Sequence, residues 1–368
     1  WETGLWEPLQ ERYVDLDDHI KNDLDIELLK RTPSAYLGSC RFKLPDISQD
    51  REIYDKIFDI LNKLEIEYFF YIGGNDSMDT IKKLSDYSLL NGSNIRFMGV
   101  PKTIDNDLAA TDHTPGYGSA AKYIASTMKE IIRDALVQPI KIVNIIEIMG
   151  RNAGWLTAAS ALAKGDDCEG VDLIYLPETV FDINKFVAKV QEIQKTKKQI
   201  VVAVSEGVKT ADGKYVCESA SSNMLVDSFG HKQLSGTASA LANVISNEIG
   251  CKTRAIEFST IQRCASHIAS LTDVNEAFIV GGIAVKAAFD GETGKVGIFQ
   301  RLSNKPYLMG TSIYDVNAIA NVEKTVPQEW IINDGTGVSQ EALDYMRPLI
   351  QGEIYPYMVD GLPRHIKL

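Results

Sequence analysis

The sequence contains few cysteines, and none of them belongs to a recognisable pairing motif. An odd number without any Cys-x-x-Cys spacing argues against a disulfide framework and against a structural zinc site. A reducing compartment fits this usage, so we expect a cytoplasmic protein. The five cysteines are spread over 368 residues, at Cys40, Cys168, Cys217, Cys251 and Cys264.

The chain also lacks a long hydrophobic run and an excess of positive charge. The apolar stretch Ala277–Val285 is far shorter than the ~20 residues of a membrane-spanning helix, and the segment Trp1–Trp6 is not a signal sequence. Asp and Glu number 50 against 38 Lys and Arg, which gives a formal net charge of −12. We therefore expect no nucleic-acid partner and no membrane partner, although a local cationic pocket could still hold a polyanion.

No internal repeat or low-complexity tract is present, and the 45% hydrophobic content is that of an ordinary globular protein. The length suggests two domains at about 150 residues each. Short apolar runs alternate with segments of helical spacing, which predicts an α/β fold with mostly parallel sheets flanked by helices. The predicted strands are 67–72, 95–100, 140–148, 171–176 and 199–205, and the predicted helices are 77–88, 114–136, 150–163 and 184–195.

Four polar clusters each follow one of the predicted strands. In open α/β sheets the ligand crevice lies at the carboxyl ends of the strands, so these clusters are expected to assemble one active site. The alternative is that strands simply end in turns that favour glycine. That alternative does not explain why the clusters also collect cations and paired carboxylates. The clusters are 73–77 (GGNDS), 101–107 (PKTIDND), 149–151 (MGR) and 205–207 (SEG).

The cluster PKTIDND contains the parts that phosphoryl transfer needs. Asp105 and Asp107 lie two residues apart, and Lys102 lies three residues before the first of them. A carboxylate can act as the base for an attacking hydroxyl, and a cation offsets phosphate charge. Paired acids also suit Mg²⁺, which prefers oxygen ligands. An acidic loop that is merely solvated stays open as the alternative.

The cluster GGNDS follows a strand and opens a helix. Glycines let the backbone approach a phosphate, and a helix N-terminus attracts anions. Asp76 has two interpretations: it favours the helix dipole, or it repels an anionic group of the ligand. Asn75 can offer a metal only a carbonyl oxygen, which binds more weakly than a carboxylate.

Further cations occupy turn-like or glycine-flanked positions in this negatively charged chain. Together with Lys102, these residues would form a local region of positive charge that attracts phosphates. They are Arg41, Arg151 and Arg263. Glu206 ends a predicted strand, where an acid can hold sugar hydroxyls. A role for His267 in packing stays open beside a role in ligand contact.

Taken together, these motifs resemble the phosphofructokinases, and within that family the pyrophosphate-dependent group. The similarity runs from about Gly38 to at least Gly297. PKTIDND together with MGRN is very specific, whereas GGNDS alone would be weak. The stretches that carry the resemblance are 37–42 (LGSCRF), 73–77, 99–107 (GVPKTIDND), 114–123 (TPGYGSAAKY), 147–155 (EIMGRNAGW), 205–207 and 261–263 (IQR).

The resemblance implies a role for each matched residue. The implied catalytic residues are Asp105, as the base for the 1-hydroxyl of fructose 6-phosphate, with Lys102 and Arg151. Fructose 6-phosphate would be bound by Thr103, Asp105, Met149, Gly150, Arg151, Glu206, Arg263 and His267. The phosphoryl donor would be bound by Gly74, Asp76, Ser77, Arg41 and Lys102, and Mg²⁺ by Asn75, Asp76 and Asp107.

The implied donor depends on Asp76, because ATP-using members of the family usually have Gly at this position. A carboxylate ~5 Å from an α-phosphate, at an effective dielectric of ~20, repels it by roughly 3 kcal/mol, which is about a hundredfold in binding. Pyrophosphate has no third phosphate and no nucleoside. The resemblance thus implies reversible transfer from pyrophosphate to fructose 6-phosphate, giving fructose 1,6-bisphosphate. An ATP-dependent phosphofructokinase and a non-catalytic sugar-phosphate-binding regulatory subunit stay open as alternatives.

The resemblance further implies two discontinuous domains with the active site in the cleft between them. The donor domain would comprise 1–140 and 272–325, the fructose 6-phosphate domain 141–271 and 326–368, and the protein would form a homodimer or homotetramer. This sequence departs from the family pattern at Asn75, where an Asp is usual, and in the segment that follows Arg263. The strand and Gly-Gly loop with which family members begin are not found, so we expect an N-terminally truncated chain.

Overall fold

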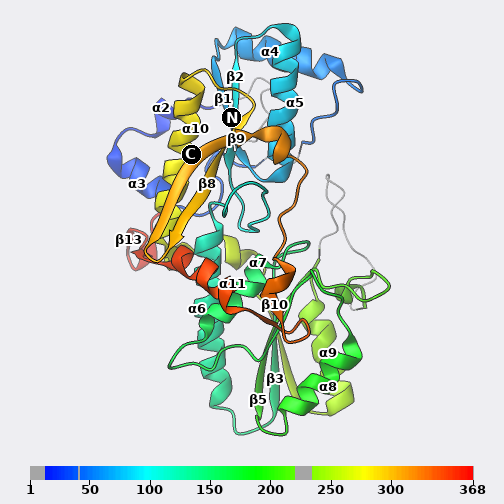
Figure 1. Ribbon diagram of the computed structural model, residues 1–368. Coiled ribbons are helices and arrows are strands. Elements are labelled where there is room, and N and C mark those ends of the chain that lie inside the picture. The colour runs from blue at the N-terminus through cyan, green and yellow to red at the C-terminus, as the bar shows by residue number, and fades with distance from the viewer. Residues whose placement is uncertain (1–12, 40–41, 220–233, 368) are drawn as a thin grey trace.

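A computed structural model describes residues 13–39, 42–219 and 234–367 of the chain. It contains two four-stranded sheets, which lie one above the other in Figure 1. The upper sheet has the order β1-β2-β8-β9, and the lower sheet has the order β4-β5-β3-β6. This architecture confirms the predicted α/β fold with mostly parallel sheets flanked by helices.

The upper sheet is formed by segments from both ends of the sequence. Its strands are β1 (Tyr68–Gly73), β2 (Arg96–Pro101), β8 (Lys295–Asn304) and β9 (Tyr307–Asp315), of which only β9 runs antiparallel to its neighbour. Phe69 and Phe97 face α4 (Arg51–Lys63) and α5 (Asn75–Asn91), while Met98 faces α10 (Leu271–Phe289) on the other side. Successive strand residues point to opposite faces, so both faces are covered by helices.

The lower sheet is entirely parallel and is also covered on both faces. Its strands are β3 (Ile142–Ile148), β4 (Leu173–Tyr175), β5 (Gln199–Ser205) and β6 (Lys252–Glu257). Residues of β3 alternate between α6 (Tyr117–Leu136) with α7 (Trp155–Ala159) on one face and α8 (Ile183–Ile193) with α9 (Thr237–Ile249) on the other. All seven residues of β3 are buried, as its β-branched sequence predicts.

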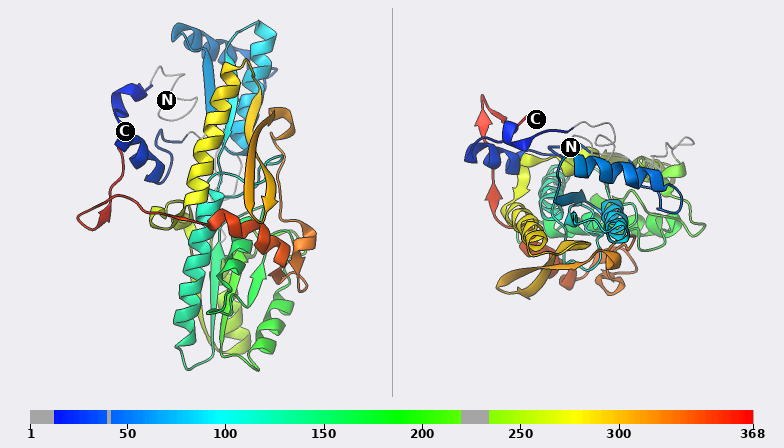
Figure 2. Two further views of the ribbon diagram at one scale, coloured as in Figure 1. Left: turned by 60° about the vertical axis from the view of Figure 1, so that its left-hand side comes forward. Right: turned by 90° about the horizontal axis from the view of Figure 1, so that it is seen from above.

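Two long helices carry the chain between the sheets. The chain leaves the upper sheet after β2, enters α6 beside the lower sheet, and returns through α10, and the two helices run along one side of the molecule in Figure 2. Within the described ranges, no helix combines the length and apolar character that crossing a bilayer requires. The remaining elements are α2 (Leu16–His19), α3 (Asp23–Arg31), β7 (Ala269–Ser270), β10 (Ile331–Ile332), β11 (Gly337–Val338), α11 (Gln340–Met346), β12 (Glu353–Ile354), β13 (Met358–Val359) and β14 (Leu362–Pro363).

Candidate active site

The GGNDS and PKTIDND motifs lie side by side at the carboxyl ends of β1 and β2. Gly73 pairs with Pro101 across the two strands, and the backbone N–H of Lys102 donates to the carbonyl of Gly73 at 3.0 Å. Helix α5 begins directly after Gly74 with no side chain capping its first turn, and Asp76 is exposed on that turn. The predicted donor-binding residues Gly74, Asp76, Ser77 and Lys102 thus share one edge of the sheet, whereas Arg41 lies outside the described residues.

Asp105 lies in the loop after β2, and its carboxylate is held by a neighbouring hydroxyl. The Thr103 hydroxyl donates to Asp105 Oδ2 and accepts from the Asp105 backbone N–H, each at 3.1 Å. Burial raises the pKa of Asp105 above its usual value. The Thr103 hydrogen bond and the charges of Lys102, Arg151 and Arg263 partly offset this effect. The structure therefore brings Arg151 and Arg263, which are distant in the sequence, close enough to Lys102 and Asp105 for their charges to interact.

The MGR, SEG and IQR motifs are joined by hydrogen bonds at the carboxyl end of the lower sheet. Gly150 has a φ of +126°, which favours glycine, and its carbonyl accepts from the Ser205 hydroxyl at 2.5 Å. Its N–H donates to Glu206 Oε1 at 3.3 Å. The buried Gln262 side chain accepts from the Met149 backbone N–H at 3.2 Å. These contacts fix the backbone from which the Arg151 side chain projects.

Acidic groups of the two sheets influence one another across the site. Burial raises the pKa of Glu206 to about 7, and the charges of Glu147 and Asp105 add to this effect. Burial likewise raises the pKa of Asp107 to about 6, with a further contribution from Asp105. The loops after β2, β3 and β5 are therefore close enough to form one site.

His267 is placed differently from the other predicted sugar-binding residues. It is exposed, and its ring lies edge-on to Tyr123 of α6, with 6.5 Å between the ring centroids. Arg263, by contrast, lines a cavity of about 210 Å³ together with Ile104, and α3 contributes Lys30 to the same cavity. Of the residues predicted on the sugar side, Arg263 is thus linked to both Asp105 and a hollow in the surface.

Sequence reasoning missed the segment 322–324, which touches both halves of the site. The carbonyl of Val322 accepts from Asn75 Nδ2 at 3.1 Å, and Glu323 accepts from Asn152 Nδ2 at 2.8 Å. The backbone N–H of Lys324 donates to the carbonyl of Asp107 at 2.7 Å. Nothing in the residues Val-Glu-Lys distinguishes this segment from a solvated loop, so no sequence signal could have identified it.

The oxygen atoms near Asn75 suit a hard divalent cation only in part. Asn75 Oδ1 is buried and has no hydrogen-bond partner in the described part of the chain, so it is free to accept a cation or a water ligand. The described residues contain no group of three or more His, Cys, Asp or Glu side chains that could hold a metal. A magnesium ion would therefore take further ligands from phosphate and water, which is its usual mode in phosphotransferases.

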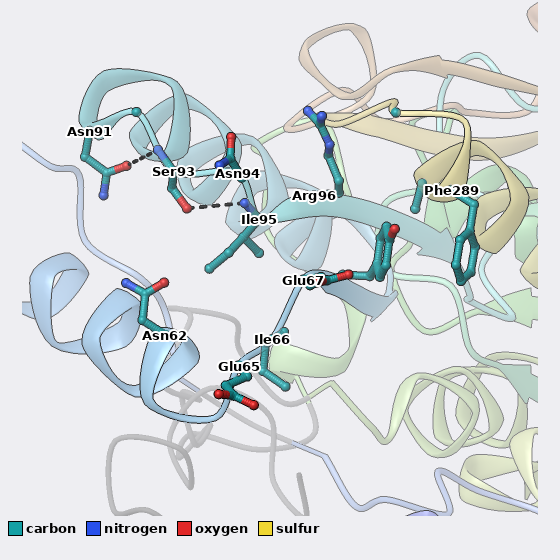
Figure 3. A pocket seen from close by; sticks show the side chains of 14 residues that line it. Asn62, Glu65, Ile66, Glu67, Asn91, Ser93, Asn94, Ile95, Arg96 and Phe289 are labelled. Carbon is teal, nitrogen blue, oxygen red and sulfur yellow. Dashed lines mark hydrogen bonds between the residues drawn. The ribbon is translucent and has the colours of Figure 1, made fainter.

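A larger cavity of about 720 Å³ lies at the opposite ends of β1 and β2 (Figure 3). Its lining includes Glu67, Arg96 and Phe289. Because it surrounds the amino ends of the strands, it is separate from the loops described above. Of the predicted site residues that the structure describes, none lines it.

A family model described as phosphofructokinase matches residues 3–263, and the chain belongs to this family. A protein of Halomonas elongata named pyrophosphate–fructose 6-phosphate 1-phosphotransferase is 39% identical over 368 residues, which is 100% of this chain and 86% of that relative. A protein of the same name from Xanthomonas campestris pv. campestris is also 39% identical and is covered to 87%. The crystal structure of a pyrophosphate-dependent phosphofructokinase from Nitrosospira multiformis superimposes with a TM-score of 0.88 at 37% identity, covering 100% of this chain and 86% of that one.

Proposed function

We propose that this chain transfers a phosphoryl group between pyrophosphate and the 1-hydroxyl of fructose 6-phosphate in a reversible, Mg²⁺-dependent reaction. The observation that carries the proposal is the position of the half-buried Asp105, whose carboxylate interacts with the positive charges of Lys102, Arg151 and Arg263. For a hydroxyl to attack a phosphate, a base must take up its proton and nearby cations must offset the phosphate charge. The similarity to relatives that bear this activity in their names supports the same conclusion.

Asp105 is proposed as the general base. A base works best when its pKa lies near the working pH, and burial moves the pKa of Asp105 upward in that direction. The Thr103 hydroxyl forms hydrogen bonds with both the side chain and the backbone N–H of Asp105, and so it restricts the orientation of the carboxylate. Lys102 and Arg151 would stabilise the negative charge that accumulates on the transferred group.

The lower sheet is proposed to hold the sugar. Glu206, with Met149 and Gly150, would bind sugar hydroxyls, because a carboxyl of raised pKa can both donate and accept hydrogen bonds. Arg263 would bind the 6-phosphate beside the 210 Å³ cavity, with His267 as a second contact.

The upper sheet is proposed to hold pyrophosphate and the metal. The uncapped first turn of α5 offers backbone N–H groups to a phosphate, and Gly74 lets the backbone approach it. Because the Ser77 N–H already donates to the Gly74 carbonyl, Ser77 would contribute its hydroxyl, and Arg41 and Lys102 would add positive charge. Asn75, Asp76 and Asp107 would hold Mg²⁺ together with the phosphates. When bound, this ion would neutralise phosphate charge during transfer.

The two sheets are proposed to correspond to two domains with the reaction in the cleft between them, the first comprising 1–140 and 272–325 and the second 141–271 and 326–368. Helix α6 lies in the first of these ranges but packs on the lower sheet, so it would join the two domains. A homodimer or homotetramer is also proposed, and light scattering on the purified protein tests it. The cytoplasmic location stays a prediction.

The proposal is tested by comparing initial rates with pyrophosphate and with ATP at equal Mg²⁺. We expect turnover of fructose 6-phosphate with pyrophosphate and at most a trace with ATP. Substitution of Asp76→Gly should raise ATP use, because it removes both the charge and the bulk. Asp76→Asn separates the two effects, since it removes only the charge. Faster turnover of the unsubstituted protein with ATP would show an ATP-dependent enzyme, and sugar-phosphate binding without turnover would favour a regulatory subunit.

A further inference from the structure

His113 lies in a buried network that the proposed chemistry does not use. It belongs to the loop between β2 and α6 that also carries Asp105, and only 1% of its surface is exposed. Its Nδ1 lies 2.9 Å from Asp112 Oδ1, and its Nε2 lies 2.7 Å from Glu276 Oε2 of α10. The ring stacks on Phe299 of β8 with 4.5 Å between the centroids and 12° between the planes.

Two ionised carboxylates on opposite sides of the ring favour its doubly protonated form. A neutral imidazole has one N–H and would turn a lone pair toward the second carboxylate, whereas an imidazolium donates to both. Burial opposes the charge, but the hydrogen bonds to Asp112 and Glu276 outweigh it, and the pKa of His113 is raised above its usual value. The geometry and the direction of the pKa shift both favour the charged form of His113 between the two carboxylates.

The other groups around the ring complete the charge balance. Arg301 of β8 donates to Asp112 Oδ1 through Nε at 3.1 Å and Nη2 at 2.8 Å, so two cations face the carboxylates of Asp112 and Glu276. Four further titratable groups face this network. Tyr307 of β9 donates to Glu276 at 2.7 Å, and Asp273 of α10 lies near the ring. Tyr345 of α11 and Lys324 donate to the Asp112 carbonyl, at 2.6 Å and 2.7 Å respectively.

A short chain of contacts connects His113 to Asp105. Thr114, the next residue, donates its hydroxyl to the carbonyl of Thr103 at 2.6 Å and its backbone N–H to Asn106 Oδ1 at 3.0 Å. Thr103 and Asn106 flank Asp105, and the Thr103 hydroxyl bonds the Asp105 carboxylate at 3.1 Å. A shift of residues 112–114 would therefore move the carboxylate of Asp105.

We propose that His113 is a positioning residue: its contact with Glu276 fastens the β2–α6 loop to α10, its contact with the neighbouring Asp112 orients the ring, and the loop so fastened holds Asp105 at the reacting hydroxyl. The proposal rests on the proposed function of Asp105 as the base. It goes further because it assigns the positioning of the Asp105 carboxylate to a side chain outside the proposed substrate-binding residues.

The first test is the variant His113→Gln, because an amide can donate to only one of the two carboxylates. We expect kcat to fall by about 10- to 100-fold, the loss that a misplaced catalytic group produces. The KM for fructose 6-phosphate should stay within about threefold, and calorimetry should show undiminished binding stoichiometry. The matched control is His365→Gln, an exposed histidine outside the network, which should behave as the unsubstituted protein.

The double variant His113→Gln/Glu276→Gln places two amides where the ring and the carboxylate met, and these can hydrogen-bond to each other, so it should recover part of kcat. A normal kcat in folded His113→Gln, with only a lower melting temperature, would reduce His113 to a structural role and overturn the proposal. If His113→Gln does not fold, Glu276→Gln alone releases one contact, and kcat is measured on that variant with the same two outcomes.

The charge on the ring is tested without any substitution by ¹⁵N NMR of histidine-labelled protein. Two protonated ring nitrogens at pH 7.5 support the proposal, and a neutral His113 ring at that pH overturns it. The folded pKa is raised, so stability from this group is complete below about pH 6.5 and is lost as the pH rises through the folded pKa. The two proposals fail in different ways. If the unsubstituted protein shows no turnover with pyrophosphate, the proposed function is rejected, while the NMR result still decides the protonation state of His113.

Discussion

The backbone carbonyl oxygen of Arg151 occupies the space where a side chain on Gly207 would begin: a Cβ atom on Gly207 would lie 1.9 Å from that oxygen. The SEG turn therefore supports the MGR turn through direct backbone contact. We expect Gly207→Ala to displace Arg151 from Asp105 and to lower kcat strongly. The overpacking should also reduce the free energy of unfolding by about 1–3 kcal/mol.

Steady-state kinetics and urea denaturation of Gly207→Ala check this expectation. The matched control is Gly282→Ala in α10, where a Cβ would meet nothing within 4 Å. That substitution should stabilise the protein by up to about 1 kcal/mol, because alanine is the better helix former, and should leave activity unchanged. Equal behaviour of the two variants would show that the contact with Arg151 is unimportant.

Removing the Asp105 carboxylate should abolish most turnover while fructose 6-phosphate still binds. For Asp105→Asn and Asp105→Ala we expect kcat to fall by about 10²- to 10⁴-fold, which is the usual contribution of a general base. Asp86→Asn is the control, because Asp86 forms a surface pair with Lys82 at 2.8 Å. A near-normal rate in either Asp105 variant would remove it as the base.

Much of the fold was predictable because buried strands and amphipathic helices leave simple patterns. The strand predicted at 199–205 coincides with β5, and the one predicted at 67–72 differs from β1 by one residue at each end. The helix predicted at 150–163 was partly wrong. It begins only at Trp155, because Gly150 adopts a positive φ and the preceding turn bonds Glu206 and Ser205 instead. The strands β8 and β9 were not predicted, although the resemblance implied that residues 272–325 belong with residues 1–140.

The candidate site was predictable where its residues sit in strand-end motifs, and not where distant segments support it. Asp105, Arg151 and Glu206 follow strands, and the parallel sheets bring those ends together. His113 and Lys324 act through contacts with backbone carbonyls and with partners far away in the sequence. Such contacts depend on the tertiary structure and leave no spacing in the sequence.

The acidic groups at the lower sheet should make stability depend on pH. The pKa of Glu206 is raised from 4.5 to about 7, mainly by burial, so its ionisation destabilises the folded protein as the pH rises from about 4.5 to about 7. Glu206→Gln removes this dependence. Relative to the unsubstituted protein, the variant should therefore gain about 1–3 kcal/mol in unfolding free energy between pH 5 and pH 8.

Urea denaturation at these two pH values measures the gain. The matched control is Glu341→Gln, because Glu341 is an exposed acid on α11. A gain of the same size in Glu341→Gln would mean that overall charge, and not the burial of Glu206, produces the pH dependence.

Lys324 should matter for both stability and turnover. Its ammonium group donates to the carbonyls of Asp112 at 2.7 Å and Thr111 at 3.1 Å and lies 3.4 Å from Asn106 Oδ1. Lys324→Met keeps the approximate length of the side chain but removes the ammonium group that lies over the Trp155 ring. The Thr111 carbonyl loses its donor, while the Asp112 carbonyl keeps Tyr345 and Asn106 keeps Thr114. We expect a loss of about 3 kcal/mol in unfolding free energy and a lower kcat, because these carbonyls belong to the loop that carries Asp105.

The contrast with a surface lysine isolates this effect. Lys305 lies 3.9 Å from Asp344, and its side chain is 82% exposed, so Lys305→Met should change stability by less than about 1 kcal/mol. Burial lowers the pKa of Lys324 to about 8, so the group is still mostly charged at pH 7, where denaturation and kinetics of both variants should be compared. If Lys324→Met were as mild as Lys305→Met, the loop would have to be held by its other contacts, among them those of His113 with Asp112 and Glu276.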